Sequence, residues 1–202
     1  MTRSLRIAAA AAVTVLALGA AGCGSSGQHT TTASPSPTLT LPTQAAGQSP
    51  LPTGQPGTPK AGLPSHVDQH DATALAAAAV TTDWTWDTDL DTSPADAQRR
   101  SAAWLTPEYA AQVQTQAPVS APGADWTQLA AHHGYTTVKL ARAYDDPSPD
   151  TPTSAWREYR VTVSEHGRDG WTGPSTVYVQ FAHLVRSDAS AVWRVSEMRV
   201  TQ

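Results

Sequence analysis

Residues 81–96, TTDWTWDTDLDTSPAD, hold closely spaced aspartates between two tryptophans and a proline. Spacing of this kind occurs in calcium loops, where carboxylates at the first, third and fifth positions bind the ion. Numbered from Asp87, however, the loop has Thr92 where the sharp turn needs glycine and Gln98 where the ion needs a bidentate glutamate. Pro94 also begins a helix inside the loop. We therefore expect no metal here, but a solvated polar corner that caps the next helix.

His183 is the histidine best placed for chemistry. It shares strand parity with three valines and Phe181, so that on the concave face of a sheet its imidazole would project into an apolar pocket. A pocket histidine can act as a general base when a second polar group orients it, and a structural histidine is the alternative. The groups that could orient it are Tyr159, Tyr178 and Asp83. No catalytic residue is assigned, and the candidates for lining a ligand pocket are Trp84, Trp86, Tyr159, Phe181 and His183.

The other histidines give weaker signals. His66 and His70 are four residues apart, which could place two metal ligands on one helical face, but they lie where a linker meets the domain. We expect them to be solvated. His132 and His133 are adjacent and cannot chelate together, so we expect them to interact with a helix C-terminus before Gly134. The sequence has no phosphate loop, nucleophile elbow or zinc spacing, and we expect no cofactor.

The elements that must position these side chains change type along the chain. Helical patterns with capping residues and early prolines cover 68–84, 93–105, 106–116 and 125–133. Alternating patterns rich in valine and aromatic residues follow at 135–144, 154–166, 175–187 and 191–202. Short joins favour an antiparallel meander. The sequence thus predicts an α+β fold, with N-terminal helices packed on a curved antiparallel sheet of about four strands.

The last predicted strand breaks its own alternation. Trp193 and Val195 share one parity, whereas Met198 and Val200 share the other. A β-bulge near Ser196 would restore one apolar face and bend the sheet.

The N-terminus predicts export. Residues 1–22 combine Arg3 and Arg6 with an apolar, alanine-rich run, as a signal peptide does. The run ends in LGAAGCGSS, which resembles a bacterial lipoprotein signal, and this resemblance implies a fatty-acylated (for instance palmitoylated) Cys23. Cys23 is the only cysteine in the chain, so it has no internal disulfide partner. We expect a lipid anchor on the extracytoplasmic face of the cell membrane.

Three segments follow from composition. Residues 1–22 are the signal peptide, and residues 23–65 are the lipidated cysteine with a Ser/Thr/Pro-rich tether that we expect to be disordered. Residues 66–202 form a single domain with all seven tryptophans. All seventeen acidic side chains lie in this domain, against ten of the thirteen basic ones. This acidic balance disfavours nucleic acid as a partner.

The order of elements, the WLTPEYAA stretch, the DW-x-x-L before the first strand and the closing WRV resemble the nuclear-transport-factor-2-like cone. That cone is found in small bacterial lipoproteins and in the periplasmic domain of a type IV secretion inner-membrane component. The resemblance implies a non-catalytic lipoprotein that binds protein partners in the cell envelope, for example as an accessory of a conjugative or secretion assembly. A module for a small apolar ligand and a cone-fold enzyme that uses a pocket histidine are the alternatives.

Overall fold

The computed structural model describes residues 53–115, 122–143 and 149–201. These residues all belong to one compact unit, 46–202. Cys23 and the predicted signal peptide lie outside the described residues. Within the described ranges, no helix combines the length and the apolar character that a membrane crossing requires.

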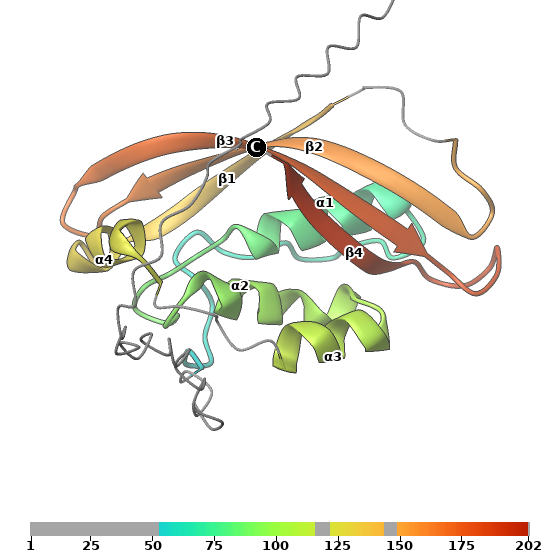
Figure 1. The fold of residues 1–202 in the computed structure, drawn as a ribbon, viewed down its shortest axis with the longest axis horizontal. Coiled ribbons are helices and arrows are strands. Elements are labelled where there is room, and N and C mark those ends of the chain that lie inside the picture. Colours follow the sequence, from blue (N-terminus) through green and yellow to red (C-terminus); the bar gives the residue numbers. More distant parts are fainter. Residues whose placement is uncertain (1–52, 116–121, 144–148, 202) are drawn as a thin grey trace, which may run out of the picture. The chain divides into compact units, whose positions relative to one another are not determined.

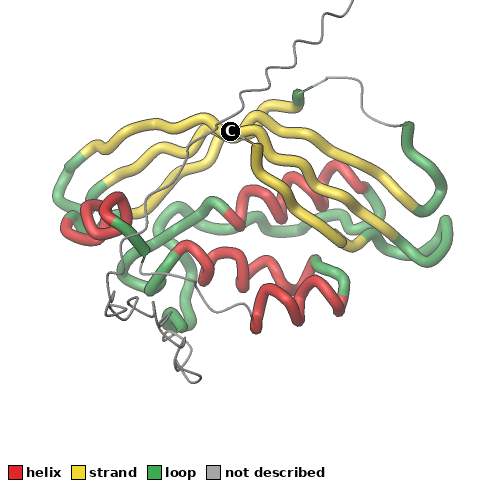
Figure 2. Tube along the Cα trace, in the orientation of Figure 1, coloured by secondary structure: helices red, strands yellow, loops and turns green. Residues whose placement is uncertain are grey.

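A four-stranded antiparallel sheet forms one layer of the unit. Its strands follow the chain order β1 (Tyr135–Arg142), β2 (Ser154–His166), β3 (Thr172–Val185) and β4 (Arg194–Thr201). Figure 2 shows the strands in yellow, running as a curved meander above the red helices. The predicted meander is confirmed.

The helices form the second layer. They are α1 (Ala72–Asp83), α2 (Pro94–Arg100), the 3-10 turn η1 (Ser101–Trp104), α3 (Pro107–Thr115) and α4 (Ala124–Ala131). The sheet arches over α1, α2 and α3, and α4 lies beneath one end of it (Figure 1). Helices on one face of an antiparallel sheet make the predicted α+β class, which is confirmed.

Small side chains let α1 lie close to the sheet. Its N-cap residue, Asp71, accepts hydrogen bonds from the amides of Thr73 and Ala74 at 2.7 and 3.2 Å. This carboxylate satisfies two of the first-turn amides that no helical carbonyl can reach. The buried face of α1 is mostly alanine with Leu75 and Val80, and it packs on buried residues of β2, β3 and β4. The helix therefore places its last residue, Asp83, and the following tryptophans against the sheet.

The predicted bulge is confirmed in β4. His183 pairs with Glu197 and Leu184 pairs with Val195, so that Ser196 has no partner of its own on β3. The extra residue resets the alternation, and Val195 and Met198 both join the core beneath the sheet.

Residues 53–65 also contact the folded unit. The Gln55 amide donates to the Leu90 carbonyl at 2.6 Å, and the Lys60 amide donates to the Asp87 carboxylate at 2.7 Å. Pro59 is buried. The sequence placed this segment in the tether because it lacks large apolar residues, but backbone hydrogen bonds to the 87–91 loop hold it without them.

Candidate functional site

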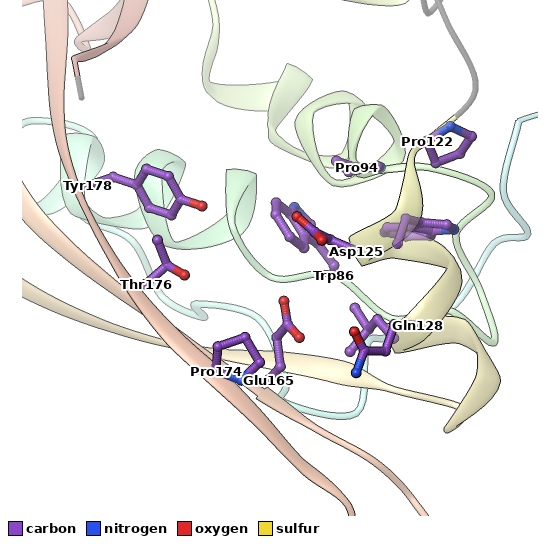
Figure 3. A pocket seen from close by; sticks show the side chains of 11 residues that line it. Trp86, Pro94, Pro122, Asp125, Gln128, Glu165, Pro174, Thr176 and Tyr178 are labelled. Carbon is purple, nitrogen blue, oxygen red and sulfur yellow. The ribbon is translucent and has the colours of Figure 1, made fainter.

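A pocket of about 270 Å³ lies between α4 and the end of the sheet where β2 meets β3. Figure 3 shows side chains of the helix layer and of the strands pointing into it. Its lining includes aromatic rings, prolines and acids, and consists of Trp86, Pro94, Pro122, Asp125, Trp126, Gln128, Leu129, Glu165, Pro174, Thr176 and Tyr178.

A second bulge shapes the floor of this pocket. Ser164 pairs with Ser175 and His166 pairs with Thr172, so Gly173 and Pro174 together face Glu165. A β-carbon on Gly173 would lie 2.7 Å from Glu165 Oε2 and 2.3 Å from the Trp171 ring. Glycine at this position leaves room for the Glu165 and Trp171 side chains, and Pro174 lines the pocket next to the Glu165 side chain.

Aromatic rings form a continuous wall. Trp84 stacks on Tyr178 with centroids 4.3 Å apart, and Trp86 lies 5.6 Å from Trp84. Trp126 of α4 extends the series, at 6.3 Å from Trp86. Trp84 is buried and its indole N–H donates to the Gln180 amide oxygen, so it supports the wall from behind. Trp86, Trp126 and Tyr178 are the rings that line the pocket itself.

Two carboxylates, Glu165 and Asp125, face the same space (Figure 3). Burial raises the pKa of Glu165, and the negative charge of Asp125 raises it further. In the ranges that the structure describes, no hydrogen-bond donor or cation pairs with either carboxylate. Among the described residues, the pocket therefore holds two carboxylates that no cation neutralises.

Asp83 lies outside this pocket, at the end of α1. Burial raises its pKa to about 6, although a hydrogen bond from Gln180 Nε2 at 3.1 Å acts in the opposite direction. Burial also raises the pKa of the neighbouring Tyr109, with a further contribution from the Asp83 charge. Asp83 is thus a carboxyl group beneath the sheet that loses its proton less readily than a free aspartate. Its side chain accepts a hydrogen bond from Gln180, whereas the sequence had offered it as a partner for His183.

The aspartate-rich corner differs from the solvated corner that the sequence predicted. Asp87, Asp91 and Asp96 are 0%, 5% and 5% exposed. Each of these aspartates is paired with an arginine. Arg168 donates to both oxygens of Asp87 at 2.9 and 2.8 Å. Arg100 binds both oxygens of Asp91, and Arg99 binds Asp96 at 2.7 Å. Pairing makes the burial of these charges possible.

The corner still caps α2, as predicted. The Asp96 carboxylate, at the third helical position, accepts from the amide of the N-cap residue Ser93 at 3.2 Å. Burial acts to raise the pKa of Asp87 and of Asp96, but the hydrogen bonds that each receives outweigh it and hold both pKa values below the usual range. Across the described ranges, no three His, Cys, Asp or Glu side chains are grouped so as to hold a metal ion.

The five predicted pocket residues do not come together. His183 and Phe181 lie on the outer face of β3, away from the helices, because Gln180, Ala182 and Leu184 face the core. Tyr159 is buried on the inner face, where its hydroxyl donates to the Thr73 carbonyl at 3.1 Å. Trp84 stacks behind Tyr178. Of the five predicted residues, only Trp86 lines the pocket.

His183 is held between two serines. Its Nε2 lies 2.9 Å from Ser154 Oγ and its Nδ1 lies 2.9 Å from Ser196 Oγ, while the ring stacks on Trp156 at 4.4 Å. A histidine that activates a serine is normally oriented by a carboxylate, whereas here the second ring nitrogen faces a hydroxyl. The two serines and the Trp156 ring hold the imidazole in place on the outer face of β3.

His132 and His133 bind separate carboxylates. His132 Nδ1 lies 2.7 Å from Asp169 and His133 Nδ1 lies 2.9 Å from Asp89. His66 and His70 are exposed, as expected.

Sequence reasoning predicted only Trp86 among the lining residues, and the ones it missed include Trp126, Asp125 and Glu165. The Gly173-Pro174 pair near the start of β3 was the available signal for a bulge at this end of the sheet.

Two solved structures are similar to this fold. One is a TrwG component of a type IV secretion system from Bartonella birtlesii, with 16% identity and a TM-score of 0.42, covering 68% of this chain and 93% of that one. The other is the VirB8 protein of Agrobacterium tumefaciens, with 14% identity and a TM-score of 0.40, covering 68% of this chain and 96% of that one. No protein-family model matches the sequence, and no curated protein matches it. The α+β assignment itself comes from the sheet and helices described above.

Proposed function

We propose that this protein is an exported lipoprotein, anchored through Cys23 on the extracytoplasmic face of the cell membrane, whose α+β domain binds a protein partner in the envelope. The observation that carries the proposal is the N-terminal sequence, in which an apolar run with two leading arginines ends in small residues at the sole cysteine. Two acyl chains on one cysteine give stable membrane attachment.

The chain between the anchor and the domain supports the same function. Residues 24–52 are rich in serine, threonine, proline and glycine, a composition typical of a tether. Such a segment holds a domain away from the membrane and lets it reach a partner. The domain would act as an accessory of a conjugative or secretion assembly, which is the role that the sequence resemblance implies.

The outer face of the sheet is the surface that we assign to the protein partner. Among the described elements no helix covers it (Figure 1), and β3 places Val177, Val179 and Phe181 there in alternate positions. Val177 is 55% exposed. Neighbouring strands add Arg160 and Arg199, so a partner would meet apolar side chains bordered by charge, as in many protein interfaces.

Metabolic labelling with an alkyne fatty acid tests the anchor. The wild-type chain is expected to take up label and to sediment with membranes, and the Cys23→Ala chain to lose both properties. Label on the Cys23→Ala chain would contradict the anchor.

A photo-crosslinking amino acid at Val177 tests the partner surface in intact cells. We expect a discrete heavier adduct, and no such adduct from the same probe at Ala103, an exposed residue of the helix layer. Equal adducts at both positions would remove the outer face from the proposal.

A further inference from the structure

The pocket beneath α4 has a composition that fits one kind of ligand. It brings three aromatic rings and two carboxylates to a space of about 270 Å³. Pockets for drug-sized ligands usually measure roughly 300–1,000 Å³, so this one suits a small group. The pocket is separate from the outer face of the sheet, and its ligand chemistry depends neither on the proposed lipid anchor nor on the proposed protein partner.

The electrostatics exclude anions and disfavour neutral ligands. A neutral apolar group would displace water from Glu165 and Asp125 without giving either carboxylate a partner, which costs free energy. An anion would add a third negative charge. A cation would instead pair with both acids, since burial and, second to it, the negative charge of Asp125 raise the pKa of Glu165.

The aromatic rings favour an organic ammonium group over an inorganic cation. The faces of tryptophan and tyrosine attract organic ammonium groups, from the lysine ammonium to quaternary ammonium ions, and the quaternary ions are weakly hydrated and can lie against the rings. Trp86, Trp126 and Tyr178 offer three such rings around one space. An inorganic cation needs several oxygen ligands, and the described residues provide no group of three metal-binding side chains.

The fold forms this pocket before any ligand binds. Gly173 leaves the room that the Glu165 carboxylate occupies, and the bulge holds Pro174 beside it. On the opposite side, Trp84 is buried and stacks on Tyr178, so the wall is fixed by the core. A site built in advance binds without the cost of ordering its own side chains.

We propose that this pocket binds an alkylammonium cation, which lies against Trp86, Trp126 and Tyr178 and pairs with Glu165 and Asp125. The same chemistry has two sources, a free quaternary ammonium compound or the lysine side chain of a peptide. The overall negative charge of the domain would favour the approach of either one.

Calorimetric titration of the full chain in neutral-detergent micelles tests the proposal. The first pair of probes is choline and 3,3-dimethyl-1-butanol, its neutral isostere. The second pair is N-acetyl-lysine amide and N-acetyl-norleucine amide. We expect a cation to bind at least about fivefold more tightly than its neutral isostere. Tighter binding of choline identifies a free compound as the ligand type, and tighter binding of the lysine amide identifies a basic side chain.

Matched variants locate the binding. Glu165→Gln and Asp125→Asn are each expected to weaken the binding of the cation about fivefold. Glu158→Gln removes the same charge from the outer face of the same strand and is expected to leave binding unchanged. Asp125 lies in the exposed first turn of α4, so its variant keeps the test valid if Glu165→Gln fails to fold.

Three results would overturn the proposal. They are equal affinity for a cation and its neutral isostere, the absence of saturable binding by both cations, and an equal loss of binding in the Glu158→Gln control.

Discussion

Replacement of Arg168 by methionine is expected to destabilise the domain. The Arg168 guanidinium donates to both Asp87 oxygens, donates to the His133 carbonyl at 2.6 Å and lies 3.1 Å from Asp89. One side chain thus joins the β2–β3 turn, the loop before α2 and the end of α4. Methionine keeps the length of the aliphatic stem and removes all four polar contacts.

The magnitude follows from the burial of the partner. Loss of one member of a buried ion pair costs about 3–5 kcal/mol, because the other charge remains buried. Asp87 is fully buried, but the Arg168 side chain is 30% exposed, and Asp87 keeps hydrogen bonds from two backbone amides. We therefore expect the free energy of unfolding to fall by about 2–3 kcal/mol, somewhat below that range.

Urea unfolding of the full chain at neutral pH, followed by tryptophan fluorescence, measures this loss. Arg160→Met is the matched control, since Arg160 is exposed on the outer face of β2, and we expect it to change the free energy of unfolding by less than about 0.5 kcal/mol. In the double variant Asp87→Asn, Arg168→Met the two effects should not add, because the residues interact directly. The reasoning would be refuted if Arg168→Met unfolded within about 0.5 kcal/mol of wild type.

Three further predictions concern the neighbouring groups. Asp83→Asn should stabilise the domain by about 1–2 kcal/mol at pH 7.5 and by less at pH 5, as measured by urea unfolding, because a carboxyl whose folded pKa is raised to about 6 destabilises the fold once it ionises. A chain beginning at His66 should be less stable to urea than one beginning at Thr53 by about 1 kcal/mol, since Asp87 loses the Lys60 amide, and equal stability would show that the segment is only adjacent. Calcium should leave the melting temperature nearly unchanged in a calorimetric scan, because the carboxylates of the corner are already bound to arginines; a large shift abolished by Asp89→Asn would contradict this.

Acid should weaken the corner in a defined direction. The folded pKa of Asp87 is depressed, so its contribution to stability is fully present above the unfolded pKa of about 4 and is lost as the pH falls through the lower folded value. The Arg168→Met variant should lose less stability than wild type on acidification through this window.

Local signals in the sequence predicted most of the fold. Asp71 and the Ser93-Pro94 pair identify helix starts because unpaired first-turn amides need nearby acceptors and proline suits the first helical turn. The parity break between Val195 and Met198 identified the bulge because only an extra residue can return both to one face. Each of these inferences uses residues within one turn or one strand.

The site depended on distant pairings that a sequence does not show. Asp87 and Arg168 are 81 residues apart in the sequence. The sequence of an aspartate-rich loop is the same whether water or arginine side chains bind its carboxylates. His183 was assigned the correct strand parity, but the choice of face depends on where the helices pack. Both faces of β3 carry apolar residues, as the exposed Val177 shows, so alternation could not decide between them.

The helices precede the sheet in the chain. Thr73 of α1 receives hydrogen bonds from Arg157 and Tyr159, which are 84 and 86 residues later, whereas the sheet closes by pairing each strand with the next. As the polypeptide emerges N-terminus first, the side of α1 that packs on the sheet therefore has no complete sheet to bury against until the strands have followed. We therefore expect the packing of α1 on the sheet to form late in folding, after the consecutive hairpins have paired.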